Sequence, residues 1–545
     1  MMEAKLTMKI FLSPKKDNRF TAIIISLIFS CIVLIHNQPT NGDAAVYFRS
    51  SIAYSEGGIS AAIYYYAWPF FSIVLHYVSR LTSLSLLNSG LLINTVLCAL
   101  LVWGFITIIK ELGGNYQTQL IAAVVILLYP YINHFRDNIL RDMGYWTFYI
   151  LAFLYLLRFS AAHRWRYAIL WNIAIALATL FRIEGILFAA FAPLFILFKP
   201  TLRLPARIGN CLKIYMIPIA IVIAGLITLY SIGTLDFLQG SRVSELLKQI
   251  QGGGSKILSA LELASTQAST YVLDFYSRHN GLVFVLGGLL GILCNQIVVN
   301  LGPVYAILTL HGFLGRRTAF TWDGKAIIVS FATINLLLFA WFMTQHLFIS
   351  KRYTTAFSLL LLLFVVYSIS GIIENYQRKR SMGKGALMLL LILALCYNFI
   401  GSLGHFGTNK TYLVEAGQWL KAHSSSKHPI YSNSAQILLY AGRTGNKAWD
   451  IDTNKINLTD PEFLGNPEKI ETNIVINKHL FRGQTEKMIN VLLKSSTPYD
   501  YIVLELSRHR SNKIADELEE KLDVERMKVF SNKKGDRVYI YKAVD

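Results

Sequence analysis

The sequence predicts a polytopic α-helical membrane protein with a small α/β domain at its C-terminal end. Three observations lead to this fold class. The 545-residue chain is 54% hydrophobic and only 15% charged, whereas soluble globular proteins carry about 25% charged residues. Its apolar residues form long runs of the length that crosses a bilayer. After about residue 404 polar residues become frequent, and short strand-like runs alternate with amphipathic helical patterns.

About eleven apolar runs are candidate membrane spans. They cover residues 20–37, 87–109, 118–132, 144–160, 166–181, 185–199, 212–231, 281–313, 326–345, 353–373 and 386–403. The first run follows Lys15, Lys16 and Arg19 and has no clear small-residue cleavage site, so we interpret it as an uncleaved first helix. The eighth run is too long for one simple span. A break is expected near Gly302-Pro303, because proline interrupts a helix.

Lysine and arginine residues cluster in alternate loops, which predicts the orientation of the chain. They precede the first span and follow the fourth, sixth, eighth and tenth, at Lys5, Lys9, Lys15, Lys16, Arg19, Arg158, Arg164, Arg166, Lys199, Arg203, Arg207, Arg316, Arg317, Arg378, Lys379, Arg380 and Lys384. These loops and the N-terminus are therefore expected in the cytoplasm. The net charge of +20 reflects this orientation, and nucleic acid is not expected as a partner.

The opposite loops are expected to face outward. They are residues 38–86, which we interpret as a polar loop, 134–142, 182–185, the long loop 232–280, and 350–352, together with the C-terminal tail. Gly252-Gly253-Gly254 in the long loop has no strand before it, so we interpret it as a flexible joint and not as a nucleotide-binding loop. The five cysteines are widely spaced, which predicts neither a disulfide framework nor a metal site.

Residues 404–545 are long enough to form their own α/β domain outside the membrane. A helix is expected over 412–422, strands over 429–432, 473–476 and 501–504, and a strand or buried segment over 437–440. A charged helix is expected over 514–522. A closing hairpin is expected from 527–530 and 537–541, joined through Lys534-Gly535-Asp536.

Asp43 lies in the first outward loop, directly behind a hydrophobic span. A carboxylate at the membrane surface is a candidate functional residue. The alternative is that Asp43 only caps the helix that starts at Ala44, since aspartate is a good N-cap residue. Gly42 is expected to allow a tight turn at this point.

The second outward loop ends at Asp142, directly before the fourth span, and the outward loops together also carry several arginines: Arg136, Arg141, Arg182 and Arg352. A carboxylate can accept a hydroxyl proton as a general base, and the planar guanidinium group fits phosphate oxygens. Two acids and several arginines at one membrane face therefore indicate chemistry on an anionic substrate, most simply a lipid phosphate. The alternative for each arginine is a side chain that extends to the lipid headgroups.

Several short motifs occur in a characteristic order: Gly42-Asp43-Ala44-Ala45-Val46-Tyr47, Trp68-Pro69, Leu140-Arg141-Asp142-Met143-Gly144-Tyr145-Trp146, Phe181-Arg182-Ile183-Glu184-Gly185, Ser350-Lys351-Arg352-Tyr353 and Glu415-Ala416-Gly417-Gln418-Trp419-Leu420. Their order and sidedness resemble the GT-C superfamily of integral-membrane glycosyltransferases, in the branch with protein O-mannosyltransferases and lipid A aminoarabinose transferases. The resemblance covers nearly the whole membrane part. Ala44 stands where protein O-mannosyltransferases carry a second acid, so strict membership of that subgroup is not expected.

The resemblance implies a hexosyl- or pentosyltransferase that moves a sugar from a polyprenyl-phosphate donor to an acceptor, with inversion at the anomeric carbon. Asp43 would be the base and Asp142 the second acid. The donor phosphate would bind to basic residues at the membrane face, for which Arg141, Arg182, Lys351 and Arg352 are the candidates. Further candidates are Asp137, Tyr47 and Glu184. No metal ligands and no cofactor are assigned, although some relatives use a divalent metal.

The expected organisation is a catalytic membrane domain, 1–403, followed by the outward domain, 404–545, in a bacterial inner membrane. The acceptor could be a glycan, a lipid or a protein. A flippase or other transporter of lipid-linked sugars is the alternative function, but transporters usually show related halves and ionisable residues in mid-span, and neither is evident here. A polymerase of lipid-linked sugars is a neighbouring alternative, and a scaffold would leave the Asp43 and Asp142 loops unexplained.

Overall fold

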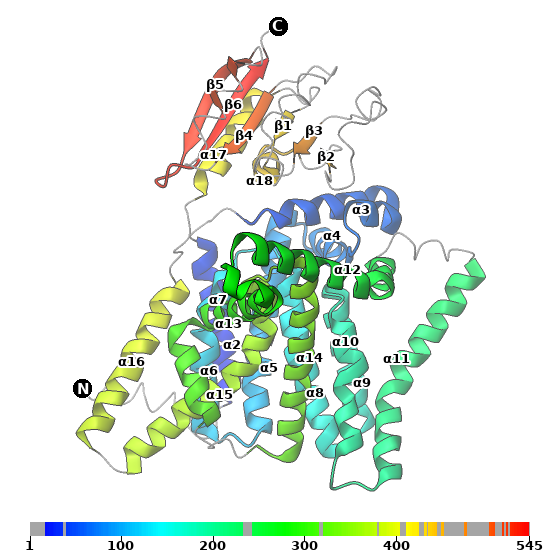
Figure 1. The fold of residues 1–545 in the computed structure, drawn as a ribbon, viewed down its shortest axis with the longest axis vertical. Coiled ribbons are helices and arrows are strands. Elements are labelled where there is room, and N and C mark those ends of the chain that lie inside the picture. The colour runs from blue at the N-terminus through cyan, green and yellow to red at the C-terminus, as the bar shows by residue number, and fades with distance from the viewer. Residues whose placement is uncertain are drawn as a thin grey trace. The chain divides into compact units, whose positions relative to one another are not determined.

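The computed structural model describes residues 17–35, 40–232, 242–314, 320–378, 381–403, 410–424, 430–432, 434–443, 448–451, 473–476, 501–506, 515–516, 519–520 and 524–543 (Figure 1). The chain forms two compact units. The helical unit comprises Met1–Val33, Gly90–Arg136 and Leu140–Gly404. The second unit comprises Leu34–Ser89, Asp137–Ile139 and His405–Asp545, so it joins the segment after the first helix to the C-terminal domain.

The helical unit is built from long apolar helices. They are α2 (Asn18–Ile35), α5 (Leu86–Glu111), α6 (Tyr116–Leu127), α7 (Pro130–His134), α8 (Arg141–Ala162), α9 (Trp165–Phe181), α10 (Gly185–Phe191) with the 3-10 helix η1 (Ala192–Phe198), α11 (Leu204–Ile232), α12 (Arg242–Tyr271), the 3-10 helix η3 (Phe275–Asn280), α13 (Gly281–Leu314), α14 (Trp322–His346), α15 (Lys351–Arg378) and α16 (Met382–Leu403). Nine of the eleven predicted spans each fall on one of these helices, whereas 118–132 covers both α6 and α7, and 185–199 covers both α10 and η1.

Within the described residues, six helical segments are long and apolar enough to cross a membrane: Leu86–Glu111, Arg141–Ala162, Phe275–Leu314, Trp322–His346, Lys351–Arg378 and Met382–Ser402. The protein is therefore an integral membrane protein, and the total of about eleven crossings stays a prediction. In the most apolar stretches of α8 and α15, 72% and 78% of the residues are buried, against 17% for α16. Helices α8 and α15 thus form the centre of the unit, and α16 presents its apolar residues outward as a lipid-facing helix does.

A break in α13 lies where proline predicted it. Gly302 has a φ of +75°, and Pro303 follows it inside the helix. Directly before the break, the buried Asn300 side chain donates to the Lys351 carbonyl oxygen at 2.7 Å and to the Thr354 and Thr355 hydroxyls at 3.2 and 3.0 Å. The interrupted helix is in this way attached to the start of α15.

Two segments that we predicted as outward loops are helical. The first contains α3 (Asp43–Tyr65) and α4 (Phe70–Thr82). The long segment contains α12, and Gly252-Gly253-Gly254 lies inside that helix, so the prediction of a flexible joint is wrong. The loop predictions rested on local polarity, and the joint was predicted because the glycine run has no strand before it. Packing overrides both, because α3 packs against α4, and α12 packs against α13 and α14.

The second unit contains a six-stranded sheet with the strand order β2-β3-β1-β4-β6-β5 (Figure 1). The strands are β1 (Ile430–Ser432), β2 (Ala448–Ile451), β3 (Asn473–Ile476), β4 (Tyr501–Leu506), β5 (Val524–Ser531) and β6 (Arg537–Ala543). Strands β2, β3, β1 and β4 are parallel, and β6 and β5 add the predicted antiparallel hairpin. The turn of the hairpin places Gly535 at a φ of +88°, where a residue without Cβ is favoured.

Helix α17 (Thr411–His423) also confirms its prediction and packs against β5 and β6. The core between them contains Leu413, Leu420, Val503 and Ile540. The segment predicted as a strand or buried segment over 437–440 is buried but helical, as α18 (Ala435–Tyr440). The charged helix predicted over 514–522 lies largely outside the described residues. All five cysteines are free.

Candidate active site

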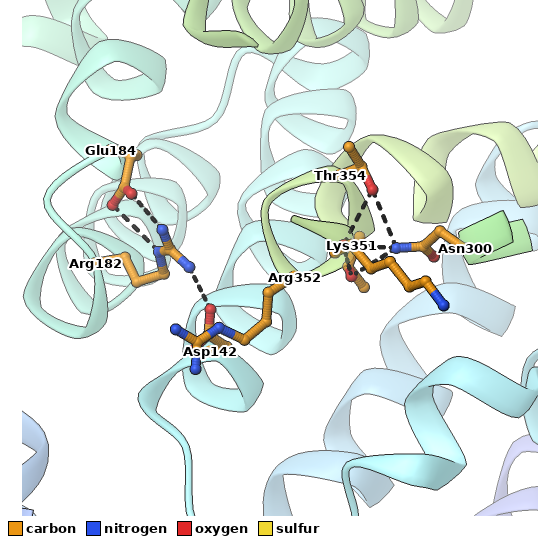
Figure 2. Close-up of polar contacts among 8 residues, drawn as sticks. Asp142, Arg182, Glu184, Asn300, Lys351, Arg352 and Thr354 are labelled. Carbon is orange, nitrogen blue, oxygen red and sulfur yellow. Dashed lines mark hydrogen bonds and ion pairs between the residues drawn. The ribbon is translucent and has the colours of Figure 1, made fainter. Parts of the chain in front are cut away.

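Asp142 and Arg182 form a buried ion pair in the helical unit. Asp142 lies in the first turn of α8, and Arg182 follows the last residue of α9. The Arg182 Nη1 atom donates to Asp142 Oδ1, and the side chains are only 5% and 2% exposed, respectively. The start of a helix favours a carboxylate because the helix dipole is positive there. The ion pair thus joins the predicted start of the fourth span to the predicted end of the fifth (Figure 2).

Glu184 binds the other side of the same guanidinium group. Arg182 Nη2 donates to Glu184 Oε1, and Arg182 Nε donates to Oε2 at 3.3 Å, so the contact is bidentate. Burial by itself would raise the pKa of the Glu184 carboxyl, but the positive charge of Arg182 outweighs it and holds this pKa at about 2. Despite its own burial, Arg182 has a pKa raised above its ordinary value by the Glu184 and Asp142 carboxylates. Glu184 and Arg182 are therefore both charged at neutral pH.

Arg352 lies near the carboxylate oxygen of Asp142 that Arg182 does not bind, and its side chain is partly exposed. Its Nε atom is 4.0 Å from Asp142 Oδ2, and its side chain is 32% exposed. Tyr353, the next residue in α15, has its ring 4.7 Å from the Arg182 guanidinium carbon, and Tyr145 of α8 has its ring 5.7 Å from the same atom. The Asp142–Arg182 cluster, as we call Asp142, Arg182, Glu184 and Arg352, thus contains two carboxylates and two guanidinium groups flanked by two tyrosine rings.

Two glycines allow the helix ends to approach so closely. A Cβ atom on Gly144 would overlap with the ring of Phe181, the residue before Arg182. A Cβ atom on Gly185 would lie 2.6 Å from Thr179 Oγ1 and 2.8 Å from Thr179 Cα. Real Cβ atoms do not make contacts this short, so a larger residue at either position would force the ends of α8, α9 and α10 apart. Glycine at 144 therefore places Arg182 next to Asp142.

Lys351 is not part of this cluster. It is the exposed first residue of α15, and its backbone carbonyl oxygen accepts the hydrogen bond from Asn300. In Figure 2 its side chain extends away from Asp142 and Arg182. Arg141 precedes Asp142 in α8 and is half-buried, and its positive charge also lowers the pKa of Glu184.

Arg136, the remaining arginine of the loops predicted to face outward, is a buried structural residue. It is 2% exposed and its Nη1 donates to the Ser26 carbonyl oxygen at 2.9 Å and to Ser30 Oγ at 2.8 Å. Its Nε donates to Asn133 Oδ1 at 2.7 Å. Arg136 thus attaches α2 to the end of α7, and the alternative of a side chain that extends to lipid headgroups is wrong for this residue.

Asp43 belongs to the second unit. It is the half-buried first residue of α3, and the residue in the N-cap position is Gly42, so the alternative that Asp43 is the N-cap residue is wrong. Gly42 has a φ of −63°, a value that any residue adopts, so the turn itself does not require glycine. Tyr47 is buried against Tyr66 and Phe71, with ring centroids 5.3 and 5.1 Å apart, which assigns it to the packing of α3.

Asp137 lies in the short 137–139 segment of the second unit. It is 8% exposed, and its Oδ1 accepts a hydrogen bond from Asn138 Nδ2 at 2.9 Å. Within the described residues no group of three or more His, Cys, Asp or Glu side chains is placed to hold a metal ion.

Sequence reasoning selected Asp142, Arg182, Glu184 and Arg352, which lie together, although their roles stay predictions. It quoted Tyr145, Gly144 and Tyr353 within motifs without assigning them a role, and it passed over Asn300. A polar asparagine two residues before Gly302-Pro303, inside an apolar run, was the available signal for Asn300.

No protein-family model and no curated protein matches the sequence. The fold is similar to that of solved membrane proteins. The archaeal oligosaccharyltransferase AglB from Archaeoglobus fulgidus, solved with an inhibitory peptide and a dolichol-phosphate, aligns with a TM-score of 0.52 and 14% identity over 96% of this chain and 74% of AglB. The structure therefore confirms the GT-C-like fold that the sequence resemblance implied.

Two further structures align over most of this chain with lower scores. The arabinofuranosyltransferase AftD from Mycobacteria, in its R1389S variant, gives a TM-score of 0.49 and 13% identity over 97% of this chain and 41% of AftD. ArnT from Cupriavidus metallidurans gives a TM-score of 0.44 and 12% identity over 96% of both chains.

Proposed function

We propose that this protein is a membrane glycosyltransferase that transfers a sugar from a polyprenyl-phosphate donor to an acceptor hydroxyl. The observation that carries the proposal is the Asp142–Arg182 cluster in a chain with the fold of an oligosaccharyltransferase. A buried ion pair with a further acid and a further arginine beside it is costly for a membrane protein unless function requires it. The dolichol-phosphate in the AglB structure supports a lipid phosphate as the group that this fold accommodates.

The donor phosphate is expected at Arg352. Arg182 is saturated by two carboxylates and is 4% exposed as a residue, so it has little capacity for a further anion. Arg352 keeps a third of its side chain exposed. Asp142 and Arg182 would then act as a buried support that orients Arg352, with Arg141 as a second phosphate ligand. Lys351 was a candidate for binding the donor phosphate. We propose only a peripheral contact for it, because its side chain extends away from the cluster (Figure 2).

Asp43 is the proposed general base. In the proposed step, the acceptor hydroxyl oxygen forms a bond to the anomeric carbon while the bond from that carbon to the phosphate oxygen breaks. The hydroxyl proton moves to the Asp43 carboxylate, and the lipid phosphate leaves with the electron pair of the broken bond. The positive charge of Arg352 stabilises the leaving phosphate. Attack opposite to the leaving group would invert the anomeric configuration.

We propose residues 1–403 as the catalytic membrane domain and 404–545 as an outward domain, with the N-terminus in the cytoplasm of a bacterial cell. The sugar is a hexose or a pentose, and the acceptor is a glycan, a lipid or a protein. Reporter fusions at either terminus test the orientation. A reporter that is active only outside the cytoplasm should be active at the C-terminus and inactive at the N-terminus, and the reverse result would overturn the assignment.

The function is tested by transfer of radiolabelled sugar from a panel of polyprenyl-phosphate sugars in membranes. Asp43→Asn keeps the size of the side chain and removes the base, so it should abolish transfer at an equal amount of inserted protein. Glu56→Gln is the matched control, because Glu56 is an exposed carboxylate on the same helix. Equal transfer by the Asp43→Asn and Glu56→Gln variants would refute the role of Asp43.

The same panel tests the donor side and the transport alternative. Arg352→Ala should raise the KM for the donor about 10-fold or more, since a charge-assisted phosphate contact is lost, whereas Arg352→Lys should restore part of it. In proteoliposomes, movement of a lipid-linked sugar between leaflets with no transfer to any acceptor would identify a transporter and overturn the proposal.

A further inference from the structure

The main chain directly before Asp43 is held by the C-terminal domain. The Gln436 side-chain amide donates to the carbonyl oxygen of Thr40, and the Thr40 backbone N–H donates to the hydroxyl oxygen of Tyr440 at 2.9 Å. Both backbone groups of Thr40 are thus bound by one helix, α18, from residues about 400 positions further along the chain. All these residues belong to the second unit. We call this arrangement the Thr40 clamp.

The Thr40 clamp has the geometry of a specific contact. Gln436 and Tyr440 are four residues apart, so they lie on the same face of α18. Thr40 and Gln436 are 2% and 5% exposed, so their hydrogen bonds are shielded from water. A buried backbone N–H or C=O group without a partner is costly, and α18 supplies both partners of Thr40.

The first turn of α3 follows directly after the segment that the Thr40 clamp binds. The Ala44 N–H donates to the Asn41 carbonyl oxygen at 3.3 Å, and the Ala45 N–H donates to the Gly42 carbonyl oxygen at 3.2 Å. Gly42 also lies beside Gln436, since a Cβ atom on this glycine would be 3.9 Å from Gln436 Cγ. The Asp43 Cα atom is therefore placed from both sides, by the clamp before it and by the buried Ala44 and Ala45 after it.

We propose that Gln436 and Tyr440 are positioning residues that order the first turn of α3 and fix the orientation of the Asp43 carboxylate. This inference rests on the proposed function for its catalytic consequence. In this proposal the role of the C-terminal domain is to hold the segment that carries the proposed base. A base that is displaced by about 1 Å can lose about 100-fold in rate, so two hydrogen bonds to a backbone three residues away can control turnover.

Amide hydrogen exchange of the purified full-length protein tests the ordering directly and needs no substrate. Tyr440→Phe removes only the acceptor of the Thr40 N–H, and Gln436→Leu removes only the donor to its carbonyl. Both variants should show exchange at residues 41–46 that is about 10-fold faster than in the wild type. Tyr412→Phe is the matched control, because Tyr412 is a buried tyrosine of the same domain whose hydroxyl donates to Glu505 Oε1 at 3.4 Å. Unchanged exchange at 41–46 in both clamp variants, or an equal increase in Tyr412→Phe, would overturn the proposal.

Steady-state transfer kinetics on the same variants test the catalytic consequence. Tyr440→Phe and Gln436→Leu should lower kcat about 10-fold to 100-fold with the KM for the donor unchanged, and Tyr412→Phe should retain both constants. Faster exchange with unchanged kcat would show that the clamp orders the turn without serving catalysis, which overturns the positioning role. If the wild type transfers no sugar, the proposed function fails by itself, and hydrogen exchange still decides whether the clamp orders the turn.

Discussion

Removing the Arg182 side chain is the sharpest test of the Asp142–Arg182 cluster. In Arg182→Met the Asp142 side chain, which is 2% exposed, loses the hydrogen bond and the positive charge of Arg182. A solvent-exposed ion pair contributes only about 0–1 kcal/mol, whereas loss of one partner of a buried pair costs about 3–5 kcal/mol. Arg352, 4.0 Å from Asp142, still supplies a positive charge. The expected loss in the free energy of unfolding is therefore near the lower value, about 3 kcal/mol.

The double variant Asp142→Asn/Arg182→Met separates this mechanism from a simple loss of packing. The double variant also removes the Asp142 charge, so Glu184, with 26% of its side chain exposed, is the one carboxylate of the cluster that has lost Arg182 as its partner. The double variant should therefore be more stable than Arg182→Met alone. The assay is unfolding in detergent micelles with a denaturing detergent, followed by tryptophan fluorescence. The buried-pair reasoning would be refuted if the free energy of unfolding of Arg182→Met were within about 1 kcal/mol of the wild type. It would also be refuted if the loss in the double variant equalled the sum of the losses in the two single variants.

Two further predictions concern the same cluster. Gly144→Ala should lower the free energy of unfolding by about 1–3 kcal/mol, because the new Cβ atom would overlap with the ring of Phe181. Adding Phe181→Leu to the same chain should recover part of this loss. An unfolding midpoint of Gly144→Ala equal to that of the wild type would contradict the prediction. The pKa of Glu184, held at about 2 against an ordinary 4.5, means that its contribution to stability is complete above pH 4.5 and is lost as the pH falls towards 2. The stability difference between the wild type and Glu184→Gln should therefore shrink as the pH falls from about 5 to about 3, and a constant difference in unfolding midpoints would contradict the assignment.

Much of the helical unit follows from the sequence because a bilayer imposes strong local rules. A helix that crosses lipid must satisfy its backbone internally and must be apolar over about 20 residues. The apolar length is visible in the sequence and the backbone requirement makes such a run helical, so every predicted span falls on helical structure, two of them on a pair of shorter helices. The break at Gly302-Pro303 was predictable for the same reason, since proline lacks the backbone N–H that a helix needs. In the C-terminal domain, the alternating and turn-forming residues predicted β4 and the β5–β6 hairpin.

Prediction failed where the helix-forming signal is not local. Residues 43–82 and 242–271 are polar or rich in glycine, and the sequence favoured loops there. Helix α3 packs against α4, and α12 packs against α13 and α14, and these contacts are not visible in the sequence. The short segment 437–440 has the composition of a strand, but in the fold it packs as a helix beside α17. A run of four apolar residues does not distinguish these two structures.

The sequence by itself determined the fold class, the positions of the long apolar helices and the charged residues of the segments between them. Only the tertiary structure decided which charges act together. Arg136 and Arg182 look alike in the sequence, yet one attaches α2 to α7 and the other neutralises two carboxylates. The contact of α18 with Thr40 was also invisible, since nothing in either segment indicates a partner about 400 residues away. The physical reason is that hydropathy acts along the chain, whereas ion pairs and hydrogen bonds depend on which segments the folded chain brings within a few ångströms.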